Sequence, residues 1–151
     1  MDAVTYPEEK VIDFIVGQTI PLRVSSADAL ADQFNVQWTP TLAVLDSEGK
    51  EHSRTVGYLG PAEIAPILLL GIARAYFNRE ENEQALVVYN KLIAEYPASD
   101  QIPEAIFFYG VVMYKHTHEP KYLRAAYDRL TAEHPGHEWT KRAYPYRLIG
   151  V

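Results

Sequence analysis

The side chains able to do chemistry are few, and the absence of cysteine narrows them further. The 151 residues include no cysteine, which excludes a disulfide, a thiolate nucleophile and a cysteine metal site. Histidines form two local groups, His116 and His118 beside Glu119, and His134 with His137. Zinc needs ligands fixed on a stable element with further hydrogen bonds behind them, whereas these histidines fall in predicted loops between helices. We therefore expect no metal site.

Acidic residues gather at Glu80, Glu81 and Glu83, where a structural role explains them better than catalysis. General acid–base catalysis needs two carboxylates held in a cleft with shifted pKa values. This segment instead predicts a turn and the first turn of a helix, where acidic side chains favour the helix dipole. His52 stands alone on a predicted edge strand, where we expect it to be solvated. Without a Ser-His-Asp grouping, a phosphate-binding glycine loop or a dinucleotide fingerprint, we expect no catalytic residue, no cofactor and no enzymatic activity.

The overall charge argues against two classes of partner. The chain carries 14 Lys and Arg against 20 Asp and Glu, a formal charge of −6 and a pI near 5.3. Nucleic acid and anionic membranes are therefore poor partners. The longest apolar run, Ile64 to Ile72, is far below the roughly 20 residues that span a bilayer. No signal peptide is visible at the N-terminus, so we expect a cytoplasmic protein, or an envelope protein if translation begins further upstream.

Apolar spacing and turn residues predict the elements of the first half. A helix is expected from Pro7 to Val16, a short strand over Thr19–Val24, and a helix through Ala27–Phe34 capped by Ser25 or Ser26. The run Thr41–Leu45 has no polar alternation, which predicts a strand covered on both faces.

A hairpin and a long helix follow that strand. Asp46–Lys50 has the composition of a hairpin turn, and Glu51–Tyr58 can return as an antiparallel edge strand. Pro61 fits the first turn of a helix. The predicted order is helix, strand, helix, strand, strand, helix.

This order, together with four short stretches, resembles the thioredoxin-like thiol:disulfide proteins. The stretches are Met1–Pro7, Leu30–Val36, Thr39-Pro40-Thr41 and Asp46–Lys50, of which Thr39-Pro40-Thr41 is the most specific. The resemblance covers residues 1–70 and implies an α/β thioredoxin-like domain that is incomplete at its N-terminus. In that family a first strand and a Cys-x-x-Cys pair come immediately upstream of where this chain begins, and both are missing here.

The same resemblance implies a peptide-binding site at Trp38, Thr39 and Pro40. In thioredoxin-like proteins the loop before a cis-proline offers backbone groups to an extended substrate peptide, a form of strand addition. The alternative is that Thr39-Pro40 merely ends a loop and that Trp38 packs on a neighbouring helix.

The missing first strand also has a structural consequence. In the family it lies between the second strand and the hairpin, so Thr19–Val24 and Thr41–Leu45 lose their shared neighbour. Each buried backbone group left unpaired would cost about 1–3 kcal/mol. Three outcomes stay open: the two strands pair directly, another copy of the chain fills the gap, or the true reading frame starts upstream with a Cys-x-x-Cys. Because exposed edges drive strand exchange, a homodimer through strand edges is expected.

The second half has the spacing of a helical repeat. The set Leu69, Ile72, Ala73, Tyr76, Ala85, Tyr89, Leu92 and Pro97 matches the tetratricopeptide consensus. A shift that places Tyr76 on Tyr114 also places Pro97 on Pro135, with extra residues around 116–119. This half resembles the tetratricopeptide-like repeats of bacterial envelope and assembly proteins.

The expected organisation is therefore a thioredoxin-like domain over residues 1–70 and an all-α repeat region over residues 66–151. A helix at about 61–78 is shared, and a terminal helix at Glu138–Leu148 caps the array. The repeat tyrosines predict packing between helices, although a groove there can hold a partner's helix or extended segment.

We interpret the chain as a cysteine-free, redox-inactive module, bacterial in type, that binds a protein or peptide partner. The alternative function is that of a thiol:disulfide oxidoreductase whose catalytic Cys-x-x-Cys lies upstream of Met1.

Overall fold

The structure is a computed structural model that describes residues 1–150. The chain divides into two compact units, residues 1–68 and residues 69 onward, and each is described by itself. Helix α3 (Pro61–Asn78) contributes its first residues to one unit and the rest to the other. None of the helices in the described part is long and apolar enough to cross a membrane.

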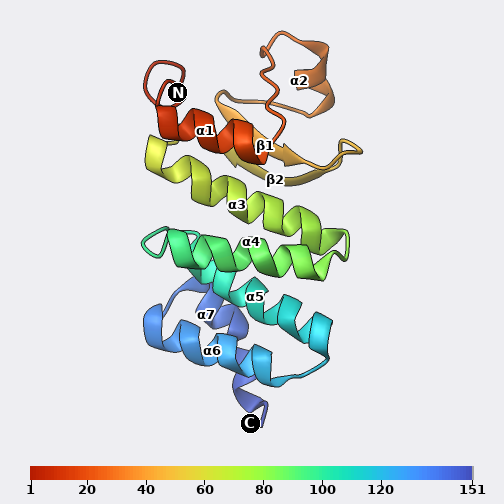
Figure 1. The fold of residues 1–151 in the computed structure, drawn as a ribbon, viewed down its shortest axis with the longest axis vertical. Helices are drawn as coiled ribbons and strands as arrows, with labels where there is room; N and C mark the ends of the chain where they lie inside the picture. The colour runs from red at the N-terminus through yellow and green to blue at the C-terminus, as the bar shows by residue number, and fades with distance from the viewer. Residues whose placement is uncertain (151) are drawn as a thin grey trace. The chain divides into compact units, whose positions relative to one another are not determined.

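The first unit combines short helices with a small sheet (Figure 1). Its elements are α1 (Glu9–Gln18), α2 (Ala29–Gln33), β1 (Thr41–Leu45), β2 (Glu51–Val56) and the start of α3. β1 and β2 are antiparallel, with Thr41 opposite Val56, Val44 opposite Ser53 and a bulge between Val44 and Leu45. The predicted hairpin and the helix beginning at Pro61 are confirmed.

Both early helices begin later than their sequence predicts. α1 starts at Glu9 rather than at Pro7, because the preceding turn is used to bury Thr5, whose Oγ1 donates to the carbonyl of Leu59 at 2.6 Å. α2 is capped by Asp28 rather than by Ser25 or Ser26, since the Asp28 carboxylate accepts from the amide of Leu30 at 2.8 Å.

One apolar core holds the first unit together. It joins Val11 of α1, Leu59, and Ile64 and Leu68 of α3, with the β1 side chains Leu42 and Val44 packed against it. Ala43 and Leu45 of β1 are exposed instead. The prediction that this strand is covered on both faces is therefore wrong, because α1 and α3 supply their side chains to the same face.

The predicted strand at Thr19–Val24 is also wrong. These residues form no regular structure, and the sheet of the described chain consists of β1 and β2 alone. The alternating apolar pattern is present, but a strand needs a neighbour to accept its backbone hydrogen bonds, and direct pairing with Thr41–Leu45 does not occur.

The second unit is a run of packed helices (Figure 1). It contains the rest of α3, then α4 (Asn82–Glu95), α5 (Ile102–Thr117), α6 (Lys121–Glu133), α7 (Glu138–Ala143) and a 3₁₀ helix (Tyr144–Leu148). Buried residues at helical spacing form its core, among them Tyr89, Leu92, Val112 and Leu130. The single terminal helix predicted over Glu138–Leu148 is two elements, and the α-helix ends just before the turn that contains Pro145.

Candidate functional site

The loop that carries Trp38, Thr39 and Pro40 begins where α2 ends. Asn35 has a φ of 50°, a left-handed conformation that asparagine adopts more readily than most residues. The turn is closed by the amide of Val36, which donates to the carbonyl of Ala31 at 2.9 Å. Gln37 Nε2 also donates to Asn35 Oδ1 at 2.6 Å. Local hydrogen bonds therefore define how the loop leaves the helix.

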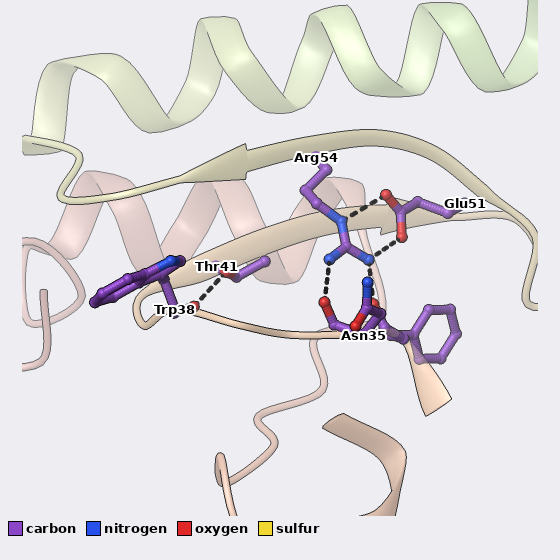
Figure 2. Close-up of polar contacts among 6 residues, drawn as sticks. Asn35, Trp38, Thr41, Glu51 and Arg54 are labelled. Carbon is purple, nitrogen blue, oxygen red and sulfur yellow. Dashed lines mark hydrogen bonds and ion pairs between the residues drawn. The ribbon is translucent and has the colours of Figure 1, made fainter. Parts of the chain in front are cut away.

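Arg54 of β2 ties the start of this loop to the sheet, as Figure 2 shows. Its Nη2 donates to the carbonyl of Phe34 at 2.6 Å, and its Nη1 approaches the carbonyl of Asn35 at 3.4 Å. The guanidinium is oriented by Glu51, which accepts from Nε at 2.8 Å and from Nη2 at 2.6 Å. This hydrogen-bonded pair lowers the pKa of Glu51 and raises the pKa of Arg54. The planar guanidinium can donate to the Glu51 carboxylate and to the loop carbonyls at the same time.

The three predicted site residues stand together at the end of the loop. The peptide bond between Thr39 and Pro40 is cis. Trp38 is 75% exposed, and its ring points away from the Arg54 contacts in Figure 2. Trp38 therefore does not pack on a neighbouring helix of its own unit. Its carbonyl accepts from Thr41 Oγ1 at 2.6 Å, which links the loop to the first residue of β1.

The edge of β1 that faces away from β2 is open within the described chain. Pro40 accepts from the amide of Gly57 at 2.9 Å, so in an antiparallel ladder the backbone groups of Thr41 and Ala43 point to the opposite edge. No hydrogen bond from the backbone of Thr39, Thr41 or Ala43 reaches another described residue on that side. The loop and the strand together thus present a row of free donors and acceptors.

The β1–β2 hairpin is held by a buried hydrogen bond between His52 and Asp46 that sequence reasoning missed. His52 Nε2 donates to Asp46 Oδ2 at 2.8 Å, and the two side chains are 0% and 5% exposed. Asp46 Oδ1 also accepts from the amides of Glu48 and Lys50. The hydrogen bond from His52, followed by those from the backbone, lowers the pKa of Asp46 to about 2. The expectation that His52 is solvated is wrong. The register passes from Ser53 opposite Val44 to Glu51 opposite Leu45, which leaves His52 at the bulge, and its ring is buried against Asp46.

The remaining histidines lie at or near the ends of helices. His118 ends α5 with a φ of 60°, and His137 begins α7, where its Nδ1 accepts from the amide of Trp139 at 3.2 Å. The rings of His134 and His137 lie 6.4 Å apart. No three or more histidine and acidic side chains gather as a metal site among residues 1–150.

A small apolar cavity lies where α4, α5 and α6 of the helical unit meet. It has a volume of about 130 Å³ and is lined by residues that include Ile93, Ile106, Tyr109, Tyr122 and Arg129. A cavity of similar size in another protein admits a single aromatic ring. This space can therefore accept one apolar side chain.

The comparison with known protein families agrees with this division of the chain. Residues 3–71 match the family model described as a thioredoxin-like domain, and residues 68–99 match that of a tetratricopeptide repeat. No curated protein and no solved structure matched the chain. The predicted resemblances and the fold class, thioredoxin-like followed by helical repeats, are confirmed. The two domain types together suggest a protein-interaction module, and the sequence has no cysteine.

Proposed function

We propose that this chain binds a polypeptide in extended form along Trp38, Thr39, Pro40 and the open edge of β1. The observation that supports it is the row of unpaired backbone groups at Thr39, Thr41 and Ala43 beside an exposed tryptophan. A peptide laid along this edge adds a strand to the sheet, and main-chain hydrogen bonds then supply affinity. In binding of this kind the main chain gives affinity for many sequences, and side-chain contacts give specificity.

Trp38 adds an apolar surface at one end of the open edge. A large aromatic side chain that is exposed in the free protein gains from burial against a partner, and tryptophan is enriched among residues that dominate binding energy. The bound segment is therefore an extended one with a bulky apolar residue that reaches Trp38. The proposed binding involves no thiol–disulfide exchange, because that exchange needs a thiolate and the sequence has no cysteine.

The helical unit offers a separate contact for a polypeptide. The cavity beside Tyr109 and Tyr122 takes one apolar side chain, and repeat arrays commonly bind peptides through such grooves. The homodimer, the cytoplasmic location and the bacterial origin expected from the sequence stay predictions, as do the domain boundaries at residues 66 and 70.

A thiol:disulfide oxidoreductase remains the alternative function. It is favoured by the match to the thioredoxin-like domain and by the open edge of β1, where the first strand of that family would lie. The coding region upstream of Met1 distinguishes the two functions. An in-frame segment that encodes a strand and a Cys-x-x-Cys supports the oxidoreductase, whereas a stop codon close to Met1 excludes it. Reproducible reduction of insulin by this chain alone would contradict the binding-only proposal.

The direct test uses a fluorescein-labelled decapeptide of alternating Val and Thr with one central Phe, followed by fluorescence anisotropy. Trp38→Ala is expected to weaken binding at least tenfold. The control is Val87→Ala on α4, because Val87 is exposed to a similar degree, 69%, but lies outside the site.

A second variant tests the hydrogen bonds themselves. Ala43→Pro removes one donor from the open edge and leaves the ladder with β2 intact, since proline is tolerated where the N–H faces solvent. This variant is expected to bind the peptide more weakly. Weaker binding is also expected when alternate amides of the peptide are N-methylated. If the methylated peptide or the Ala43→Pro variant binds as tightly as the unmodified pair, the strand-addition proposal is refuted.

A further inference from the structure

The segment Ile20–Val24 exposes apolar side chains at every second position. Ile20, Leu22 and Val24 are 98%, 73% and 37% exposed, and Pro21 and Arg23 alternate with them. No backbone amide or carbonyl of these five residues forms a hydrogen bond with any residue that the structure describes. Alternation of this kind places all three apolar side chains on one face once the segment is extended.

The segment is complementary to itself in one antiparallel register. When Leu22 lies opposite Leu22 of a second copy, Ile20 lies opposite Val24, so apolar side chains meet apolar side chains. If these are the hydrogen-bonded pairs, the backbone groups of Pro21 and Arg23 point to the outer edges. The N–H that Pro21 lacks is then not needed, whereas a shift of one residue would place it in the ladder.

Charge is compatible with this pairing. Arg23 is the one charged residue in the segment, and its Nη2 contacts Asp2 Oδ2 of its own chain at 2.8 Å. In the register centred on Leu22, Arg23 lies opposite Pro21, so no like charges face each other. The outer edges carry Pro21, which blocks the addition of further strands. The arrangement therefore closes as a two-fold dimer rather than growing into a fibre.

We propose that Ile20–Val24 pairs with the same segment of a second copy as an antiparallel two-stranded ribbon centred on Leu22. This interface is separate from the peptide site at Trp38 and the β1 edge, and it goes beyond the proposed function. Ribbons of five residues bury far less surface than a standard stable interface. The dimer is accordingly weak and depends on protein concentration.

The absence of cysteine makes a site-specific test possible. In the dimer, position 22 of one copy lies about 5.5 Å from position 22 of the other, within the Cα range of a disulfide. Position 20 lies about 14 Å from its own equivalent, because the two are four residues apart along the ribbon. Under mild oxidation Leu22→Cys should form a covalent dimer at least tenfold faster than Ile20→Cys. Random collision predicts the reverse order, since Ile20 is the more exposed residue.

Sedimentation velocity over about a hundredfold concentration range, with free thiols absent, gives an independent measurement. Leu22→Pro removes two backbone donors at the two-fold axis and should raise the dimer dissociation constant at least tenfold. Arg23→Pro is the matched control, because it introduces the same residue where the N–H points outward. Both positions lie outside helices and strands, and far-UV circular dichroism verifies that the variants fold.

Three results overturn the proposal. The unmodified chain could remain monomeric throughout the concentration range, which would show that the segment does not pair with a second copy. Ile20→Cys could cross-link as fast as Leu22→Cys. Leu22→Pro could associate as strongly as Arg23→Pro.

Discussion

Replacement of Gly110 by alanine should separate two helices that pack at van der Waals contact. A Cβ atom at this position would lie 2.5 Å from Cβ of Ala126 and 2.9 Å from the carbonyl oxygen of Tyr122. Gly110 is buried in α5, and both contacted atoms belong to α6. The second contact is with backbone, so rotation of a side chain cannot relieve it. α5 must therefore move away from α6.

The magnitude follows from two opposing terms. Overpacking of this kind typically destabilises a protein by about 1–3 kcal/mol, and contact with backbone places the variant at the upper end. Alanine in a helix interior is favoured over glycine by about 1 kcal/mol. The expected result is a net loss of about 2 kcal/mol in the free energy of unfolding of the helical unit. Ala126→Gly removes the closest contact, so the double variant should recover at least about 1 kcal/mol relative to additivity.

Unfolding in urea can be followed through Trp139, whose ring lies 5.1 Å from that of Phe107 and 5.3 Å from that of Phe108. A Trp38→Phe background removes the other tryptophan. The control is Gly17→Ala in α1, where nothing lies within 4 Å of the added Cβ. That variant should stabilise its unit by about 0.5–1 kcal/mol, measured by far-UV circular dichroism. If Gly110→Ala is as stable as the unmodified chain, the close approach of α5 and α6 is refuted.

Two further predictions concern polar groups in the interior. Because the pKa of Asp46 falls from its ordinary 3.8 to about 2, its contribution to stability is present above about pH 4 and is lost as the pH falls toward 2. The stability of the unmodified chain should therefore drop more steeply between pH 5 and pH 2 than that of Asp46→Asn, and parallel acid titrations of unfolding would contradict this. Tyr89 has a buried hydroxyl without a hydrogen-bond partner, and burial raises its pKa. Tyr89→Phe should leave the free energy of unfolding unchanged or increase it by up to about 1 kcal/mol in urea, whereas a loss of 1 kcal/mol or more would show that the hydroxyl is satisfied.

Features set by local sequence were predictable, and those set by distant contacts were not. The hairpin at Asp46–Lys50 and the helix from Pro61 follow from turn and cap residues that act within a few positions. The pattern at Thr19–Val24 is as strand-like as that of Thr41–Leu45, yet only the second finds a partner, β2, immediately after it in the chain. Strand propensity depends on this neighbour more than on the residues themselves.

The candidate site shows the same limit. Trp38, Thr39 and Pro40 were predicted from the family resemblance, but Arg54, which holds the loop, was not predicted. Its contacts with Phe34 and Asn35 span 20 and 19 residues, and its partner Glu51 is three positions away on the same strand. Residues three apart on a regular strand point to opposite faces, so no periodic pattern indicates this pair. The bulge at His52, whose ring contacts Asp46, likewise leaves no sequence signal.

The contacts that position the loop involve no sulfur atom. Trp38 is linked to β1 through Thr41, the start of the loop is held to β2 through Arg54, and the hairpin is stabilised by Asp46 and His52. All of these groups lie between residues 34 and 54, and none depends on a sulfur atom or on residues near the first helix. These hydrogen bonds hold the loop to the hairpin, and the core with α1 and α3 holds β1. The open edge of β1, on which the proposed binding of a polypeptide rests, is therefore formed without a cysteine.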